Sequence, residues 1–326
     1  MQKAIGVLTS GGDAPGMNAA VRAVARAAIV RGYKVYGIQR GYNGLLNGEV
    51  EELCERDVSG VIQRGGTVLY TARCKEFTTP EGVKKGAEKC RQLGIEGLVV
   101  IGGDGSFRGA RDLCGEGIHC IGLPGTIDND ISCTEYTIGY DTAMNTAVEM
   151  IDKLRDTAQS HDRCSVVEVM GRHAGWIALN VGLAVGAIGI LVPEIPYDLG
   201  KLSAKIKKSQ ANRKQHFIVV VAEGAVATAN TSSSEDIAKK LMELSGIETR
   251  ATILGHVQRG GAPTLRDRVI ASEMGYYAVE LLNAGASNRV VGLKNGKVYD
   301  IDINEGLAMK KPFDEKLYRA ADEISF

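Results

Sequence analysis

Two Gly-Gly-Asp tripeptides, at 11–13 and 102–104, each follow a short apolar run. Glycine after a strand lets backbone N–H groups approach a phosphate closely, and the start of a following helix favours negative charge. Asp104 is suitably placed to hold Mg²⁺, directly or through water. A plain glycine turn with a capping aspartate is the alternative for either tripeptide alone. Because the arrangement occurs twice, the sequence favours two sides of one polyphosphate site.

A third segment, 122–130 (GLPGTIDND), also follows an apolar run. One residue separates Asp128 from Asp130, so in an extended loop both carboxylates would point the same way. A carboxylate near a metal-bound phosphate can accept the proton of an attacking hydroxyl, and a second can help to organise the metal. In the alternative, both aspartates bond only the local backbone of a turn.

Basic residues form a separate group at or just beyond the expected strand ends. They are Arg163, 170–172 (MGR), Arg250 and 255–261 (GHVQRGG). Arginine binds phosphate in a bidentate fashion, so this group predicts a pocket for a phosphorylated substrate. Arginines on a solvated face are the alternative, but the bracketing glycines suit a loop that approaches a ligand closely. Glu223, at another strand end, could accept hydrogen bonds from sugar hydroxyls.

The elements that position these residues alternate between strands and helices along the chain. The expected strands are 3–9, 34–39, 97–101, 119–123, 165–169, 188–192, 216–222 and 249–254. The expected helices are 17–31, 81–93, 105–114, 139–158, 173–185, 198–210, 234–245 and 266–284. This alternation predicts an α/β fold with mainly parallel sheets, whose ligands bind beyond the carboxyl ends of the strands. We expect an exposed loop over 224–234 (GAVATANTSSS).

Composition limits the classes of function. The 39 basic and 39 acidic side chains of this 326-residue chain cancel, which disfavours nucleic acid or a membrane surface as a partner. The seven cysteines show no CxxC pair, so we expect reduced thiols and a cytoplasmic protein. No signal peptide is expected at the N-terminus. The apolar stretch 176–192 contains Asn180 and ends at Pro193, and it predicts a buried helix turning into a strand rather than a membrane span.

The segments GGDAPGMN, IGGDGS, PGTIDND, VEVMGRHAG and GHVQRGG, in this order and spacing, resemble the bacterial ATP-dependent 6-phosphofructokinases. The resemblance covers nearly the whole chain. It implies two similar three-layer lobes with the active site in the cleft between them. The ATP-binding lobe would contain 1–138 and 257–307, and the fructose 6-phosphate-binding lobe 139–256 and 308–326. The implied reaction converts ATP and fructose 6-phosphate to ADP and fructose 1,6-bisphosphate.

The resemblance also implies residue roles. Asp128 would be the base on the sugar's 1-hydroxyl, assisted by Thr126 and Arg172, and Asp104 the Mg²⁺ residue. The implied ATP-binding residues are Gly12, Arg73, Cys74, Gly103, Asp104, Gly105 and Ser106. The implied sugar-phosphate residues are Thr126, Ile127, Asp128, Met170, Gly171, Arg172, Glu223, His256, Val257, Gln258 and Arg259. Arg163 and Arg250 match residues that reach in from a neighbouring subunit, which implies a homo-oligomer, usually a tetramer.

The sequence departs from strongly regulated family members at the family's second, effector site. Five of its residues match, namely Arg22, Arg26, Arg155, Lys214 and His216. However, Glu55 and Asn212 stand where an arginine and a lysine are expected, and Ile188 where an acid helps to hold the effector's magnesium. Arg56 could substitute for the first. The basic run 201–214 is expected to be mostly a solvated helix face.

Three other functions are weighed against this one. A pyrophosphate-dependent phosphofructokinase shares the fold and acceptor, but such enzymes carry an acid at the position of Gly105 and a lysine at that of Gly125. NAD and lipid kinases also carry Gly-Gly-Asp-Gly, yet they lack the PGTIDND and GHVQRGG pair. A nucleotide-sensing protein without catalysis would not need Asp104, Asp128 and Arg172 together.

Overall fold

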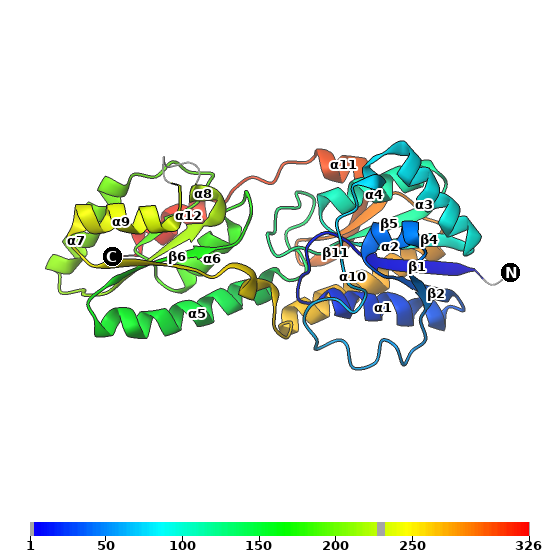
Figure 1. The fold of residues 1–326 in the computed structure, drawn as a ribbon, viewed down its shortest axis with the longest axis horizontal. Helices are drawn as coiled ribbons and strands as arrows, with labels where there is room; N and C mark the ends of the chain where they lie inside the picture. Colours follow the sequence, from blue (N-terminus) through cyan, green and yellow to red (C-terminus); the bar gives the residue numbers. More distant parts are fainter. Residues whose placement is uncertain (1–2, 227–231, 326) are drawn as a thin grey trace. The chain divides into compact units, whose positions relative to one another are not determined.

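The computed structural model describes residues 3–226 and 232–325, and the chain divides into two compact units. The first unit contains Met1–Ile127, Ile131–Thr142 and Arg259–Lys311. The second contains Asp128–Asp130, Ala143–Gln258 and Pro312–Phe326. The chain therefore passes repeatedly between the units (Figure 1).

The first unit is built on a seven-stranded sheet with the order β11-β10-β5-β4-β1-β2-β3. Its strands are β1 (Ala4–Thr9), β2 (Lys34–Ile38), β3 (Val50–Glu52), β4 (Ile95–Gly102), β5 (His119–Pro124), β10 (Arg289–Lys294) and β11 (Lys297–Asp302). The strands from β10 to β2 pair in parallel, whereas β3 and β11 add antiparallel edges. The central strands β1 and β4 are almost wholly buried, as expected for a parallel sheet covered on both faces.

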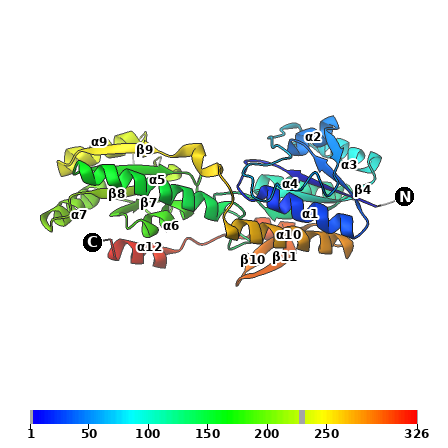
Figure 2. The ribbon, with the colours of Figure 1, turned by 90° about the horizontal axis from the view of Figure 1, so that it is seen from below.

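Helices cover both faces of this sheet (Figure 2). Helices α1 (Met17–Val30) and α10 (Leu265–Asn283) pack against each other on one face. The other face carries α2 (Gly41–Asn47), α3 (Pro80–Gln92), α4 (Asp104–Gly115) and α11 (Ile303–Ala308), with a 3₁₀ turn at Glu76–Thr78. A core between this second set and the sheet includes Phe107, Leu113 and Leu98. The unit is therefore a three-layer sandwich.

The second unit contains a four-stranded parallel sheet with the order β7-β8-β6-β9. Its strands are β6 (Cys164–Val169), β7 (Gly189–Leu191), β8 (Phe217–Ala222) and β9 (Thr249–Ile253). Its helices are α5 (Tyr140–Ser160), α6 (Trp176–Ala184), α7 (Leu199–Ala211), α8 (Glu223–Val226), α9 (Ser234–Ser245) and α12 (Glu315–Glu323), and a 3₁₀ turn spans Gly255–Arg259. Helix α6 packs against α12 and strands β7 and β8, whereas α7 packs against α9, which contacts β6 and β9. The expected three-layer α/β architecture is thus confirmed, although the two sheets differ in size.

All eight expected strands and all eight expected helices are present, with ends that differ by a few residues. The stretch after Trp176 is helix α6 followed by β7, as expected. No helix among residues 3–226 and 232–325 is long and apolar enough to cross a membrane. The expected loop over 224–234 is partly wrong, because Gly224–Val226 belong to α8 and α9 begins at Ser234. Its centre, 227–231, lies outside the described residues.

Candidate active site

Three glycine-containing loops meet at the carboxyl edge of the first sheet, where β1, β4 and β5 end side by side. The register pairs Thr9 with Ile101 and Gly102 with Pro124. The Ser10 N–H donates to the Ile101 carbonyl at 2.9 Å, and the Ser106 hydroxyl donates to the Ser10 carbonyl at 3.2 Å. The two Gly-Gly-Asp turns are therefore neighbours.

The third loop is tied to the second by the N–H of Gly125, which donates to the carbonyl of Gly102 at 3.0 Å. Gly102 cannot carry a side chain, because an added Cβ would lie 2.4 Å from Ser106 Oγ and 2.5 Å from Ser10 O. The close approach of these loops therefore depends on the glycine at the end of β4. Sequence reasoning placed the loops at strand ends, and the strand order brings them together.

Gly12 lies directly beneath the side chain of Arg259. A Cβ at Gly12 would lie 2.0 Å from Arg259 Nη1, so the guanidinium occupies the space that a side chain would need. Arg259 also lies 4.0 Å from Asp13 Oδ1. The glycine thus admits an arginine from the GHVQRGG segment to the turn at 11–13, which neither motif alone predicts.

Asp104 is the first residue of α4 and is exposed. Cβ atoms built at Gly103 and Gly105 on either side would meet no atom within 4 Å. An exposed carboxylate at a helix N-terminus, flanked by open space, fits a hard cation that takes one or two protein carboxylates and fills its other positions from phosphate and water. The residues thus fit Mg²⁺. Arg73 is exposed, and Cys74 is half-buried against the hydrophobic core of the first unit.

The loop Thr126–Asp130 does not have the expected extended form. Asn129 adopts a left-handed backbone with φ 50°, so the chain is not extended between Asp128 and Asp130, and the condition under which their carboxylates would point the same way is not met. Asp128 is 7% exposed, whereas Asp130 is exposed. The sequence could not reveal this, because asparagine tolerates both conformations. Thr126 is half-buried and Ile127 is buried.

In the second unit, two side chains hold the loop Met170–Arg172 at the end of β6. Glu223 Oε1 accepts from the backbone N–H groups of both Gly171, at 3.2 Å, and Arg172. Gln258 Oε1 accepts from the Met170 N–H at 2.8 Å. Glu223 follows β8 and Gln258 follows β9, and these two strands flank β6 in the sheet. The loop after β6 is therefore held from both neighbouring strands.

These hydrogen bonds hold a strained backbone. Arg172 has φ 57°, a left-handed conformation that is costly for a residue with a Cβ and that persists only when neighbouring groups enforce it. Its side chain is exposed, together with those of His256 and Val257. Gln258 is 0% exposed, so its side chain contacts the loop Met170–Arg172 and not solvent. Sequence reasoning treated Glu223 as a ligand for sugar hydroxyls and missed its contact with the backbone.

Arg163 and Arg250 bracket one carboxylate. Arg163 Nε lies 2.9 Å from Glu248 Oε2, and Arg250 Nη2 lies 2.9 Å from Glu248 Oε1. The hydrogen bonds from both arginines lower the pKa of Glu248. The shared carboxylate holds the two guanidinium groups together on the second unit.

The residues matched to an effector site fall into two groups. Arg22 and Arg26 lie one turn apart on α1, and Arg26 Nη2 donates to the Glu55 carbonyl at 3.3 Å. Arg155, Lys214 and His216 cluster in the second unit. Burial and the charge of Arg155 lower the pKa of both Lys214 and His216.

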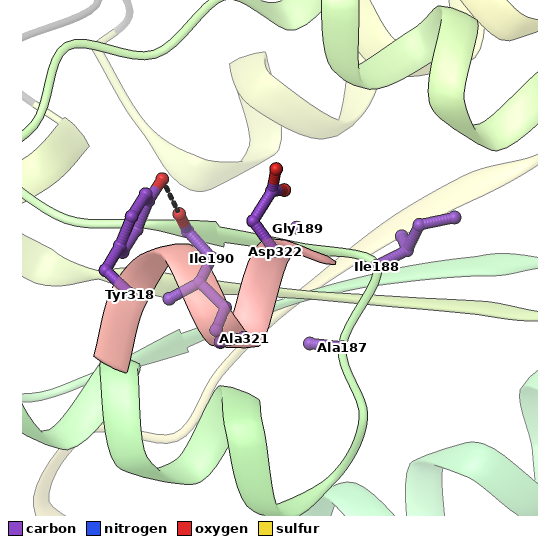
Figure 3. A pocket seen from close by; sticks show the side chains of 7 residues that line it. All are labelled: Ala187, Ile188, Gly189, Ile190, Tyr318, Ala321 and Asp322. Carbon is purple, nitrogen blue, oxygen red and sulfur yellow. Dashed lines mark hydrogen bonds between the residues drawn. The ribbon is translucent and has the colours of Figure 1, made fainter. Parts of the chain in front are cut away.

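The positions at which the sequence departs from the family's effector site lie in both units. Ile188 is buried and lines a pocket of about 10 Å³ with Tyr318 and Asp322 (Figure 3). Within this pocket the Tyr318 hydroxyl donates to the Ile190 carbonyl at 3.0 Å. Glu55, Arg56 and Asn212 are exposed. On α7, Lys201, Lys207 and Lys208 are exposed, which confirms a largely solvated basic face. Lys205 is the exception, because its side chain is 12% exposed and pairs with Asp322 at 2.5 Å.

Sequence reasoning also missed Asp267, which is fully buried in the first unit. Its carboxylate accepts from the Tyr136 hydroxyl at 2.5 Å, the Gly139 N–H at 2.7 Å and the Thr142 N–H at 2.9 Å. Burial raises its pKa despite these bonds. The signal was present, because Thr264 and Asp267 have the spacing of a capping box, and Thr264 does cap α10. The carboxylate ties the start of α10 to the segment that leads into α5.

Comparisons with known proteins agree with this geometry. The family model described as phosphofructokinase matches residues 4–282. Proteins named ATP-dependent 6-phosphofructokinase are 57% identical in Clostridium botulinum, over 99% of both chains, and 55% identical in Clostridium tetani, also over 99% of both.

Solved structures give the same result. The phosphofructokinase of Saccharomyces cerevisiae is 35% identical with a TM-score of 0.91, covering 98% of this chain and 50% of the yeast chain. A pyrophosphate-dependent phosphofructokinase from Marinobacter aquaeolei is 24% identical with a TM-score of 0.82, over 97% of this chain and 86% of that one, and supports the fold alone. The chain belongs to the phosphofructokinase family.

Proposed function

We propose that this protein is an ATP-dependent 6-phosphofructokinase, which transfers the γ-phosphoryl group of ATP to the 1-hydroxyl of fructose 6-phosphate. The observation that carries the proposal is the meeting of the two Gly-Gly-Asp turns and the loop that leads to Asp128 at one edge of the first sheet. Full-length relatives at 57% identity that are named for this activity support it.

The first unit would bind ATP. Backbone N–H groups of the turns at 11–13 and 102–106 would bind the phosphate chain. The open space beside Gly103 and Gly105, where an added Cβ would meet no atom within 4 Å, supports this. Arg73 and Cys74 would line the rest of the site. Asp104 would hold Mg²⁺, which when bound neutralises charge on the phosphate oxygens.

Asp128 would act as the general base on the attacking hydroxyl. A carboxylate that is 7% exposed is largely shielded from water, which strengthens its electrostatic interaction with a nearby hydroxyl. Thr126, two residues earlier, and Ile127 would help to position the acceptor. Arg172 would stabilise negative charge on the transferring group.

The second unit would bind fructose 6-phosphate. Met170–Arg172, with Glu223 and 256–258, form the proposed sugar-phosphate site of this unit. Arg259, the last residue of the expected set, belongs to the first unit, where its guanidinium lies at Gly12. Arg163 and Arg250 would complete the site of a neighbouring subunit in a homotetramer. A cytoplasmic location is favoured by the seven free cysteines.

The proposed donor is ATP rather than pyrophosphate. At Gly105 an added side chain would project into open space beside Asp104, where we place the longer donor. At Gly125 an added Cβ would lie 3.0 Å from both Ile101 Cγ2 and Met17 Cε, so a lysine there would require those side chains to shift. Neither the acid nor the lysine that pyrophosphate-dependent enzymes carry at these two positions is present.

Product analysis tests the proposal. Purified protein is incubated with ATP, Mg²⁺ and fructose 6-phosphate, and the products are identified by ³¹P NMR. We expect ADP and a sugar with phosphates at positions 1 and 6. ATP hydrolysis without a bisphosphate, or phosphorylation of fructose 1-phosphate in preference, would refute the assigned acceptor.

A further inference from the structure

A loop of the first unit, between β3 and the 3₁₀ turn at Glu76–Thr78, carries two of the residues that we assign to the ATP site. Its last part, 64–74 (RGGTVLYTARC), ends on Arg73 and Cys74. Neither residue lies on a helix or strand, so their positions depend on the contacts that hold the loop. Those contacts come from the start of α1 and from the turn at 11–13.

Asn18, the second residue of α1, makes three hydrogen bonds to the loop. Its Nδ2 donates to the carbonyls of Arg64 at 3.0 Å and Gly65 at 3.3 Å, and its Oδ1 accepts from the Val68 N–H at 2.7 Å. The side chain is 1% exposed, so these bonds are shielded from water. An amide suits this position because one short side chain offers both a donor and an acceptor.

Two threonines hold the part of the loop that is nearer to Arg73. The Thr71 hydroxyl donates to the Gly11 carbonyl at 2.9 Å, and the Thr9 hydroxyl donates to the Tyr70 carbonyl at 2.7 Å. Gly11 begins the first Gly-Gly-Asp turn, so Thr71 joins the loop to that turn two residues before Arg73.

The conformation of this loop is imposed by its surroundings. Tyr70 has φ 52°, a left-handed conformation that is costly for a residue with a Cβ and that persists only when neighbouring groups enforce it. Earlier in the loop, a Cβ added at Gly65 would lie 2.3 Å from the carbonyl oxygen of Gly261, so two backbone segments meet there. The bonds of Asn18 and Thr71 therefore hold a segment that would not keep this shape by itself.

We propose that Asn18 and Thr71 are positioning residues for ATP, because they hold the loop so that Arg73 and Cys74 lie beside the turn at 11–13. This inference rests on the proposed function, since it takes the ATP site to be the one described above. A loop that is held before the nucleotide arrives loses less conformational freedom on binding. Releasing the loop should therefore weaken ATP binding and leave the chemical step nearly unchanged.

Asn18→Asp tests the first of these two residues with a side chain of the same shape. The carboxylate can still accept from the Val68 N–H, but an oxygen replaces the nitrogen that donates to Arg64 and Gly65. Losing these buried donor contacts should raise the KM for ATP about tenfold. Because the groups at the reacting atoms are unchanged, kcat should fall less than about threefold.

Thr71→Val tests the second residue, because valine has a similar shape and no hydroxyl. The loop then loses its bond to the Gly11 carbonyl and keeps those to Asn18. We expect the KM for ATP to rise about three- to fivefold, which corresponds to one partly buried hydrogen bond.

Steady-state kinetics and calorimetric titration with ATP and Mg²⁺ measure these effects on the full-length protein, and thermal unfolding shows that each variant is folded at the assay temperature. Asn47→Asp, the same change at an exposed position at the end of α2, is the matched control and should leave the KM for ATP unchanged. The KM for fructose 6-phosphate should change less than about twofold, because the loop belongs to the first unit. A substitution that only destabilises the fold lowers the amount of active enzyme and does not raise one KM selectively.

A folded Asn18→Asp protein with the wild-type KM for ATP would overturn the role of Asn18, and equal rises in both KM values would show that the loop does not position ATP in particular. If Asn18→Asp does not fold, Thr71→Val decides, and a wild-type KM for ATP in that variant overturns the proposal. Failure of the proposed function is distinguishable, because the wild type itself would then form no bisphosphate from ATP.

Discussion

Replacing Gln258 with methionine should weaken sugar-phosphate binding by releasing the backbone of the loop Met170–Arg172. Gln258 is 0% exposed, and its Oε1 accepts the Met170 N–H at 2.8 Å. Methionine has a similar length and no strong acceptor, so the Met170 N–H is left without its partner. The loop Met170–Arg172 then keeps only its bonds to Glu223.

The size of the expected effect follows from leaving the Met170 N–H without its acceptor. Leaving a buried donor unsatisfied costs about 1–3 kcal/mol, which corresponds to roughly 5- to 150-fold in an equilibrium constant. The Gln258 Nε2 atom is buried and has no hydrogen-bond partner. Methionine lacks this unsatisfied donor, which offsets part of the loss caused by removing the acceptor Oε1. We therefore expect the KM for fructose 6-phosphate to rise about tenfold, near the lower part of this range.

Steady-state kinetics and urea unfolding measure the two consequences separately. The KM for ATP should change less than about twofold, because the altered loop belongs to the second unit. Gln210→Met, an exposed change on α7, is the matched control and should leave both KM values unchanged. A variant that loses about 1–3 kcal/mol of stability while its KM for fructose 6-phosphate stays at the wild-type value would show that this hydrogen bond does not position the loop.

Three further perturbations test other parts of the account. Asp128→Ser should leave folding and ATP binding near normal and lower kcat by about 10²- to 10⁴-fold, and a folded variant that keeps half the wild-type turnover removes Asp128 from the role of base. Arg172→Ala should weaken fructose 6-phosphate binding by about ten- to hundredfold, and a loss of ATP affinity instead would reverse the assignment of the two units. Phosphoenolpyruvate, titrated at sub-saturating fructose 6-phosphate, should inhibit only feebly because Glu55 adds negative charge and Ile188 removes a metal-supporting carboxylate. A large shift of the half-saturation point at sub-millimolar effector contradicts this reading.

Periodicity and glycine placement predicted the parallel strands and their crossover helices, because these elements are long and bury a continuous apolar face. The hairpin of β10 and β11 was missed although Asn295-Gly296 joins two alternating runs, and both residues adopt positive φ as such a turn requires. Helix α2 was missed because it is short and contains Gly41 and Gly44. Glycine disfavours helices, and only tertiary packing overrides that preference.

Motif spacing predicted the candidate site, but it could not reveal which side chains accept hydrogen bonds from the backbone of a neighbouring loop. The contacts of Glu223 and Gln258 with Met170–Arg172 join residues from three strands, and only the sheet order brings them together. The left-handed Asn129, which separates Asp128 from Asp130, likewise depends on local conformation rather than on residue type.

The choice of phosphoryl donor tests the central claim most directly. Initial rates of fructose 1,6-bisphosphate formation are measured with ATP and with pyrophosphate at equal free magnesium and saturating fructose 6-phosphate. The open space beside Gly105 and the absence of a side chain at Gly125 predict rapid turnover with ATP and little with pyrophosphate. A higher rate with pyrophosphate than with ATP would contradict the account.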